Sequence, residues 1–412
     1  MRVLHIALTN SGGAGMGMMN LHHALLAQGI DSHVLVAHKR SDKEHVVEML
    51  PNLHLWARSK WICFLQRVAC RMGFCLNDYD RWHHRIYNVR KHYPTFFTPP
   101  FSQYDILSHP LAKRADIIHL HFAAEFVDYP TFFPHVKQPV VWTVRDENPG
   151  LGGFHFQSER QRFYAPYASL EEAFIKIKRQ AIERCNTLHF VSLSPVTKAF
   201  CQHIDYLASR PNTVIPNAIS ADRFQLLPKS TAKQKLKLPP DAIILSFVSY
   251  NLDEERKGLH IVIEALSALN DKRIHLLCAG NSRGSIRENA SNIHYLGSIS
   301  DSTLLSTIYS ASDFFVNASS QETFGKTLVE ALYCGTPVIT TPVGIAPEVI
   351  RPHNGRLFTP RSAATLAHTI KEALTSSFNS PSAIRQEATR MFSAERIAQQ
   401  HLQLYSSLLK KH

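Results

Sequence analysis

The sequence predicts an α/β protein with two Rossmann-like domains, each built around a parallel sheet. A strand, a glycine-containing loop and a helix open the chain, and the same order returns at residues 243–269. A further unit of strand, loop, helix and strand spans residues 313–340. Strands that alternate with helices are typical of parallel sheets with crossover helices. At 412 residues, the chain is long enough for two such domains with separate cores.

Composition limits the class of protein. Hydrophobic residues make up 44% of the chain and charged residues 19%, as in ordinary globular proteins. No apolar run is long enough to cross a bilayer, and the apolar segment 3–8 is too short for the core of a signal peptide. The seven cysteines form no Cys-x-x-Cys pair, so we expect free thiols and neither a disulfide framework nor a zinc site. A cytoplasmic protein is expected.

The N-terminal half starts with a predicted strand at residues 2–8 and a loop at 9–15. A helix that ends at Gly29 follows, and then a second strand at 33–37. The glycines of the loop do not follow the G-x-G-x-x-G pattern, and no acidic residue ends the second strand. The G-x-G-x-x-G pattern and an acidic residue at the end of the second strand are typical of dinucleotide binding. Because both are missing here, the sequence does not support an NAD site.

Residues 56–92 carry half of the formal net charge of +12, because eight Arg/Lys against two Asp give 8 − 2 = +6. Apolar residues around Trp61 share one helical face, while Lys60, Arg67 and Arg71 share another. A basic amphipathic stretch rich in aromatic residues is typical of an element that binds an anionic membrane surface. The alternative is a core-packing helix with a solvated basic face. No nucleic-acid-binding motif accompanies the charge, so nucleic acid is not expected as a partner.

Two more strands are predicted at residues 115–122 and 139–144. On the first, His119 and His121 project to the same face of the sheet. A pair of histidines at this spacing could bind a metal ion, but no third ligand is apparent in the sequence. We therefore expect both histidines to line a binding site at the end of the strand.

The most informative segment contains two carboxylates around the start of a helix. Glu322 lies in the loop before that helix, and Glu330 lies eight residues later, inside it. The N–H groups of Gly325, Lys326 and Thr327 at the helix start form a ready site for an anion. A carboxylate beside an anion site is suited to sugar hydroxyls, which donate hydrogen bonds to it.

The run ETFGKTLVEALYCGTPVI at 322–339 resembles the signature of the retaining glycosyltransferases of family four (GT4), in the branch of bacterial polysaccharide biosynthesis. That family has the GT-B fold, in which two Rossmann-like domains face each other across a cleft. The resemblance implies an acceptor domain at 1–225 and a nucleotide-sugar domain at 241–391. It also implies a linker at 226–240 and a last helix, within 392–412, that packs back on the first domain.

The resemblance implies roles for the residues of the second domain. Glu322 would hold the hydroxyls of the donor sugar, and Glu330 the ribose diol. The Arg256-Lys257-Gly step resembles the diphosphate site of the family, where cations at a helix start stabilise the leaving group. Asn251 occupies the position of an additional arginine in the family, so it is the weaker member of this donor site. We count Glu322 and Lys257 among the catalytic residues.

Several loops complete the donor and acceptor sites by similarity. Gly280 and Asn281 follow a predicted strand and lie where a nucleotide base would bind. Gly12 and Gly13 would reach the donor diphosphate, and Ala14 the acceptor.

The acceptor side departs from the family at one position. The strand at 139–144 ends in Trp-Thr-Val, and Arg145 replaces the histidine that the family places before Asp146. Arginine cannot act as a base near neutral pH, but it can hold an acidic group of the acceptor. Asp146 is therefore the catalytic candidate on this side. The expected acceptor-binding set is Ala14, Arg145, His119 and His121.

By resemblance, the protein is a retaining glycosyltransferase that moves a hexose-type sugar from a nucleotide-diphosphate donor to a lipid-linked surface polysaccharide or oligosaccharide. The leaving diphosphate would take the proton of the acceptor, without a metal ion or another cofactor. A peripheral position on the inner face of the plasma membrane is expected. Two alternatives stay open. One is a glycosyltransferase with a soluble acceptor, and the other is a non-catalytic GT-B protein that binds nucleotide sugars.

Overall fold

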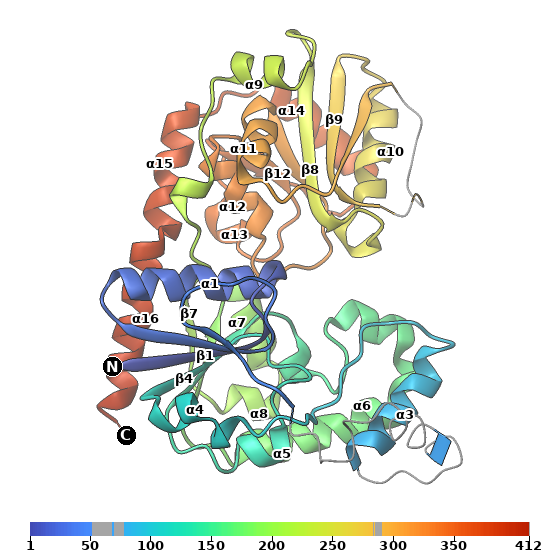
Figure 1. The fold of residues 1–412 in the computed structure, drawn as a ribbon. Helices are drawn as coiled ribbons and strands as arrows, with labels where there is room; N and C mark the ends of the chain where they lie inside the picture. Colours follow the sequence, from blue (N-terminus) through green and yellow to red (C-terminus); the bar gives the residue numbers. More distant parts are fainter. Residues whose placement is uncertain (52–67, 70–77, 283, 285–290, 412) are drawn as a thin grey trace. The chain divides into compact units, whose positions relative to one another are not determined.

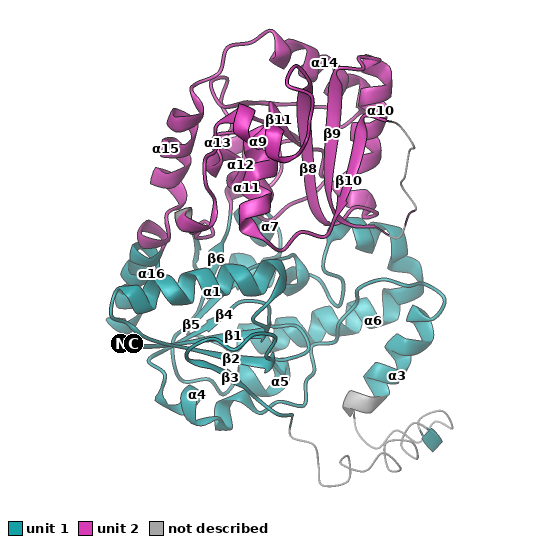
Figure 2. Ribbon diagram, turned by 45° about the horizontal axis from the view of Figure 1, so that its top comes forward, with its two compact units in different colours: residues 1–193, 197–215, 398–412 teal, residues 194–196, 216–397 magenta. Residues whose placement is uncertain are grey.

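The computed structural model describes residues 1–51, 68–69, 78–282, 284 and 291–411 (Figure 1). Its contacts divide the chain into two compact units (Figure 2). Unit 1 consists of residues 1–193, 197–215 and 398–412, and unit 2 consists of residues 194–196 and 216–397. Each unit contains one parallel sheet, as predicted for an α/β protein with two Rossmann-like domains.

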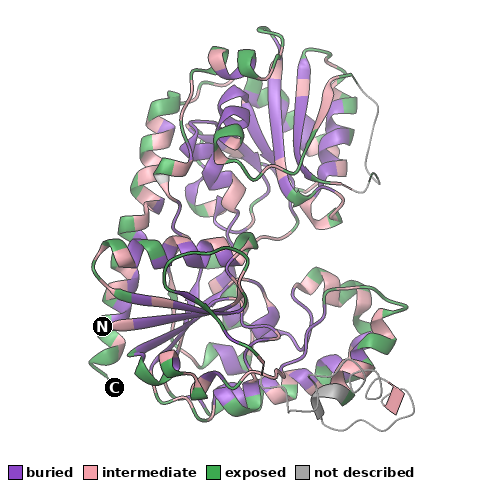
Figure 3. Cartoon of the chain, in the orientation of Figure 1, coloured by how far each residue is buried: buried purple, intermediate pink, exposed green. Residues whose placement is uncertain are grey.

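The sheet of unit 1 has the strand order β3-β2-β1-β4-β5-β6-β7 among the described residues, and all its pairs are parallel. The strands are β1 (Arg2–Thr9), β2 (Asp31–His38), β3 (Val46–Glu48), β4 (Ile117–Leu120), β5 (Val140–Val144), β6 (Leu188–Ser192) and β7 (Asn212–Val214). β4 and β5 are buried at every residue, which explains their continuous apolar sequence (Figure 3). The carboxyl ends of β1, β4 and β5 lie side by side in this sheet.

The helices assigned wholly or partly to unit 1 are α1 (Gly12–Ala27), α3 (Asp78–Arg90), α4 (Pro110–Arg114), α5 (Tyr129–Phe132), α6 (Gln157–Glu183), α7 (Pro195–Gln202), α8 (Asp205–Ala208) and α16 (Ala394–Leu409). α1 starts inside the segment 9–15, which we predicted as a loop. The loop is shorter because Gly15 packs against the backbone of Thr9 and Asn10, so that the helix leaves the strand at once.

Helix α6 is longer than predicted. The sequence indicates a helix at 168–185, whereas α6 has 27 residues and contains Pro166. Its first part is largely polar and lacks an apolar period, so the pattern gave no sign of it. The C-terminal part packs on the core through Leu170 and Phe174, which are buried.

The sheet of unit 2 has the order β10-β9-β8-β11-β12-β13 among the described residues. Its strands are β8 (Ile243–Asn251), β9 (Ile274–Asn281), β10 (Ile293–Gly297), β11 (Phe314–Asn317), β12 (Val338–Thr340) and β13 (Gly355–Leu357). The order along the sheet reverses between β8 and β11, which are neighbours. In open parallel sheets, ligands bind outside the carboxyl ends of the strands at such a switch point. Residues 252–258 and 318–325 follow these two strands.

The helices of unit 2 are α9 (Lys229–Lys235), α10 (Leu259–Leu269), α11 (Ser302–Ala311), α12 (Lys326–Tyr333), α13 (Ala346–Val349), α14 (Ala363–Leu374) and α15 (Pro381–Phe392). α9 lies in the segment 226–240, which we expected to be a linker. Instead, this segment belongs to unit 2, and α9 packs on α11. The Nζ of Lys233 is satisfied by the carbonyl oxygens of Pro240 and Ala242, so a lysine-rich stretch is held in the fold.

The basic amphipathic helix expected around Trp61, Arg67 and Arg71 lies outside the described residues. Of the segment 56–92, the structure gives mainly α3. There, Trp82 and Ile86 pack with Phe174 of α6 in a cluster of buried aromatic residues. Across the described part of the chain, no helix has the length and apolar character that spanning a bilayer requires.

Candidate active site

The turn after β8 places a lysine at the switch point of unit 2. Residues Glu255–Lys257 form a short 3₁₀ helix, and Gly258 then starts α10 with a φ of 78°. A Cβ at Gly258 would lie 2.3 Å from the carbonyl oxygen of Ala318. Only glycine lets the backbone of this turn approach the loop after β11 so closely.

Gly258→Ala is therefore expected to lower the melting temperature by several degrees. The left-handed backbone costs an alanine about 1–3 kcal/mol, and the contact with Ala318 adds to it. Gly297→Ala is the matched control, because Gly297 has a similar φ of 71° with nothing within 4 Å of its added Cβ. Calorimetry of both variants separates the two costs. Equal shifts would show that the close backbone approach contributes nothing.

Glu322 and Lys257 meet at this switch point. The Nζ of Lys257 lies 2.5 Å from Oε1 of Glu322, which also accepts a hydrogen bond from the Ser319 hydroxyl at 2.9 Å. Burial by itself would raise the pKa of Glu322, but the charges of Lys257 and Arg256 and these hydrogen bonds hold it below its ordinary value. The carboxylate is thus ionised at neutral pH, and 15% of its side chain remains exposed.

Arg256 points into the same loop through other contacts. Its guanidinium is paired with the carboxylate of Glu254, and its Nη1 donates to the carbonyl oxygen of Gln321 at 2.7 Å. The backbone N–H of Ser320 in turn donates to the carbonyl oxygen of Arg256 at 2.9 Å. The side chain therefore joins the Lys257 turn to the Glu322 loop. Its contact with a diphosphate stays a prediction.

The start of α12 has the helix-start geometry on which the predicted anion site depends. Gly325 is its N-cap residue with a φ of 89°, and Lys326 and Thr327 are the first two helical residues. The N–H groups of a first helical turn have no partner within the helix. They therefore point out of the helix start, in the loop that carries Glu322.

Glu330 lies deeper in the fold than a surface ligand residue. Its side chain is 6% exposed, and Oε2 accepts a hydrogen bond from the buried Tyr309 hydroxyl at 3.2 Å. Oε1 lies 3.3 Å from Nζ of Lys326. Burial, followed by the charge of Glu330, raises the pKa of Tyr309 well above its ordinary value, so this phenol remains a hydrogen-bond donor. The ribose contact of Glu330 stays a prediction.

Asn251, predicted at the diphosphate site, and Gly280 and Asn281, expected near the nucleotide base, lie at the carboxyl ends of β8 and β9. Asn251 and Asn281 are partners in the sheet, and the Oδ1 of Asn251 accepts from the N–H of Asp253. Gly280 fits closely, because a Cβ there would lie 2.1 Å from the carbonyl oxygen of Ser249. These residues share the edge of the sheet that carries Lys257.

In unit 1, Asp146 follows β5 and is held by a buried histidine. Its Oδ2 lies 2.6 Å from Nδ1 of His155, whose Nε2 lies 2.9 Å from the Thr98 hydroxyl. Its Oδ1 accepts from the N–H of Asn148 at 3.1 Å. Both carboxylate oxygens are thus engaged, and 11% of the side chain is exposed. Asp146 is fixed in position, and its catalytic role stays a prediction.

Two buried charges of α6 hold the loop that follows Asp146. The carboxylate of Glu171 accepts hydrogen bonds from the N–H groups of Gly152 and Gly153, at 2.9 and 2.8 Å. The Nζ of Lys178 donates to the carbonyl oxygen and to Oδ1 of Asn148, at 2.7 and 2.9 Å. Burial lowers the pKa of Lys178 to about 7. The Lys178 side chain is buried, whereas lysines on an amphipathic helix are usually exposed to solvent.

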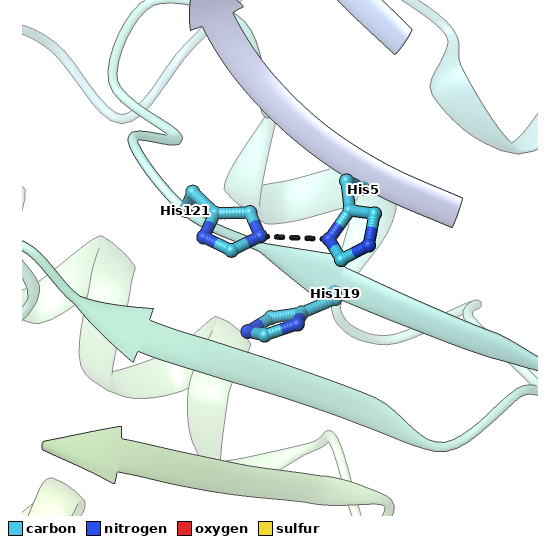
Figure 4. A group of neighbouring side chains, drawn as sticks. All are labelled: His5, His119 and His121. Carbon is cyan, nitrogen blue, oxygen red and sulfur yellow. Dashed lines mark hydrogen bonds between the residues drawn. The ribbon is translucent and has the colours of Figure 1, made fainter. Parts of the chain in front are cut away.

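His5, His119 and His121 form a group of buried histidines (Figure 4), and Arg145 contacts this group through His121. His119 and His121 share it with His5 of β1, and their potential ligand atoms all lie within 4.8 Å of one another. The third imidazole that the sequence did not reveal is thus His5, which the pairing of β1 with β4 brings opposite His119.

The contacts of His121 indicate which of its two ring nitrogens accepts a hydrogen bond and which donates one. Nη2 of Arg145 lies 3.0 Å from Nδ1 of His121, and a guanidinium only donates, so Nδ1 accepts. Nε2 of His121 then carries the proton and donates to Nδ1 of His5 at 2.9 Å. Burial keeps the pKa of both rings well below the ordinary value, so both are neutral. Arg145, His121 and His5 are thus joined in a hydrogen-bonded chain.

His119 does not line a binding site. Its ring is fully buried, and its nitrogens lie 2.6 Å from the Tyr405 hydroxyl and 2.7 Å from the Thr143 hydroxyl. Tyr405 belongs to α16, so this contact ties the end of the chain to the sheet of unit 1. The physical reason is that the side chain lies in the middle of β4, beneath the end of the strand.

His121 is also buried, whereas Arg145 is partly exposed. A small pocket is lined by His121, Trp142, Arg145, Asp146 and Asn148, among others. Burial lowers the pKa of Arg145 to about 9. Gly12, Gly13 and Ala14 form the first turn of α1 at the end of β1, and added Cβ atoms at both glycines would meet nothing within 4 Å.

Sequence reasoning missed the residues that support these sites. His155 and Glu171 hold the segment of Asp146, and Ser319 holds Glu322. Ser319 lies three residues before Glu322 in the polar stretch 319–323, a spacing that could have indicated a supporting hydroxyl. His155 and Glu171 give no local signal, because their partners lie 9 and 18–19 residues away.

The two parallel sheets with alternating helices match the GT-B fold of solved glycosyltransferases. Residues 228–391 match the sequence profile of the family described as glycosyl transferases group 1. The sucrose-phosphate synthase of Thermosynechococcus elongatus has a similar structure, with a TM-score of 0.66 at 17% identity over the full length of both chains. A structure of Anabaena HepE in complex with UDP and glucose is also similar, with a TM-score of 0.66 at 18% identity. The match covers 99% of this chain and 100% of the other.

Curated relatives match part of the chain. The Phosphatidylinositol N-acetylglucosaminyltransferase gpi3 subunit of Schizosaccharomyces pombe is 27% identical over 213 residues, 48% of this chain and 44% of that protein. D-inositol 3-phosphate glycosyltransferase 2 of Catenulispora acidiphila is 32% identical over 151 residues, 33% of this chain and 35% of that protein. The chain thus spans less than half the length of these two relatives. The family match thus covers the C-terminal part of the chain, and both relatives are named as glycosyltransferases.

Proposed function

We propose that the protein is a retaining glycosyltransferase that takes a hexose-type sugar from a nucleotide-diphosphate donor. The pairing of Glu322 with Lys257 at the switch point of unit 2 carries this proposal. Lys257 and the first turn of α12 hold the diphosphate, and Glu322 accepts hydrogen bonds from the sugar hydroxyls. The donor needs no metal ion here, because the lysine and the helix start supply the positive charge at the leaving group.

The acceptor binds to unit 1 beside the pocket of Asp146 and Arg145. We propose a glycan that is part of a growing surface polysaccharide or oligosaccharide and is carried on a lipid. Asp146 contacts the acceptor hydroxyl, and the departing diphosphate takes the proton of that hydroxyl. A second candidate is a soluble, phosphorylated acceptor. Arg145 suits an anionic group, and one relative is named for D-inositol 3-phosphate.

The test is a panel of nucleotide sugars incubated with the purified protein. Release of the nucleoside diphosphate identifies the donor, and the anomeric proton signal of the product identifies retention. UDP is the first nucleotide to titrate by calorimetry, since a protein of similar fold is described in complex with it. Binding without turnover on any donor and acceptor would favour the non-catalytic alternative. Absence of both would refute the proposal.

A lipid-linked acceptor requires the enzyme to reach a membrane, and the basic segment 56–92 would bring it there. Arg67→Gln combined with Arg71→Gln is expected to reduce binding to vesicles that contain anionic lipid, because each basic residue near the surface contributes about 1 kcal/mol. Sedimentation with vesicles at low salt measures this. Lys371→Gln with Lys272→Gln removes the same charge from other elements and serves as the control. Unchanged partitioning of the first variant would contradict membrane binding by this segment.

A further inference from the structure

Arg361 lies between β13 and α14, in a part of unit 2 that has no expected role. Its side chain reaches two segments that are far apart in the sequence. Nε donates to the carbonyl oxygen of Ala318 at 2.7 Å, and Nη2 donates to the carbonyl oxygen of Glu255 at 3.1 Å. Ala318 opens the loop that carries Glu322, and Glu255 opens the turn that carries Lys257.

We propose that Arg361 is a positioning residue for the donor site, because it holds the loop of Glu322 against the turn of Lys257. The roles of Glu322 and Lys257 in this inference rest on the proposed function. A guanidinium is suited to this role, since its planar fork reaches two acceptors at a fixed spacing. An ammonium group lacks that fork.

The same two segments are joined at two more places. Arg256 bonds the carbonyl oxygen of Gln321 and accepts from the N–H of Ser320, and the backbone of Gly258 lies against Ala318. Arg361 adds to these contacts between the loop and the turn, because its Nη2 lies next to Gly258. The two arginines thus bond the loop at two places before Glu322, at residue 318 and at residue 321.

The effect on catalysis follows from the geometry of the pair. Glu322 and Lys257 are 2.5 Å apart, and they belong to different loops. Sugar and diphosphate are parts of one donor molecule, so the distance between the two loops decides whether both are held at once. A displacement of about 1 Å in such a site can cost a factor of about 100 in rate.

The test compares Arg361→Ala with Arg361→Lys and with a matched control. Arg356→Ala is the control, since Arg356 also bonds two backbone carbonyl oxygens, those of Pro352 and Gly355, away from both loops. For Arg361→Ala we expect kcat to fall about 10- to 100-fold while the Kd of UDP changes less than about fivefold. Added guanidinium ion should restore part of this turnover, and Arg361→Lys should restore little.

Hydrogen exchange provides a readout that does not depend on activity. The N–H of Ser320 should exchange faster in Arg361→Ala than in the wild type and in Arg356→Ala, because the loop is released from the turn. Unchanged exchange and a kcat within twofold of wild type would overturn the inference. Equal losses in Arg356→Ala would also overturn it, since they would show a general loss of stability. If the wild type neither binds UDP nor turns over a donor, the proposed function fails, whereas the exchange experiment still decides the role of Arg361.

Discussion

Glu322→Ala is expected to lower kcat/KM by two or more powers of ten. The carboxylate is ionised, reaches the surface and faces Lys257, so it can accept hydrogen bonds from donor hydroxyls as the glycosidic bond breaks. Loss of a charged contact in the transition state costs roughly this factor. Steady-state kinetics with the identified donor measure it, and the Kd of UDP should change little, because UDP lacks the sugar.

Glu348→Ala is the matched control for this variant, since Glu348 is an exposed glutamate of α13 in the same unit. It is expected to keep the wild-type kcat/KM. If Glu322→Ala retained more than about a tenth of the activity, the assignment of Glu322 to the donor sugar would be refuted. An equal loss in both variants would point to instability of unit 2.

Lys257→Ala is expected to reduce kcat/KM by at least the same factor, and it should also weaken UDP binding. Lys257 supplies a cation for a leaving group whose charge increases in the transition state. Its removal also leaves the largely buried carboxylate of Glu322 without its ion-pair partner, so the melting temperature should fall as well. Kinetics, calorimetric titration with UDP and a thermal scan check the three effects.

Lys272→Ala provides the control, because Lys272 is an exposed lysine in the turn before β9. Lys257→Arg keeps the charge and should retain part of the UDP affinity. Unaltered UDP binding by Lys257→Ala would remove the lysine from the diphosphate site, even if the rate fell.

The fold could be predicted well because parallel strands carry a strong signal. β4, β5 and β11 are buried on both faces and therefore read as short apolar runs bounded by polar loops. β3 and β13 have three residues each and are partly exposed, so they lack the continuous apolar character of the equally short β12. α9 was hidden by its lysines, since charge usually indicates solvent and Lys233 instead finds carbonyl oxygens inside the fold.

The donor site was predictable in part, and for a physical reason. Glu322 and Lys257 follow strands that are neighbours at the switch point, so the order of strands and loops was enough to bring them together. The contacts of Arg256 and Arg361 were not predictable, because their partners are backbone carbonyl oxygens. Every residue has such an oxygen, and its position depends on the path of the chain rather than on residue type.

The histidines of unit 1 show the opposite limit. Their spacing indicated one shared face, which is correct for His119 and His121, whose rings lie 4.1 Å apart. Depth below the end of a strand cannot be read from spacing, so the sequence could not separate His119 from His121 near the pocket. His5 joins them only through the register between β1 and β4.

The hydrogen bonds that hold the loop after Asp146 on α6 have a consequence for engineering the acceptor site. Glu171 and Lys178 are two helical turns apart on α6, and each binds backbone atoms of the segment 148–153. A graft that exchanges this loop for one with a different backbone path, in order to change the acceptor, would remove the loop partners of both buried charges and leave Glu171 with its ion pair to Arg160. An exchange between two enzymes should therefore transfer the loop and the supporting part of α6 together, as one segment from the end of β5 through residue 178.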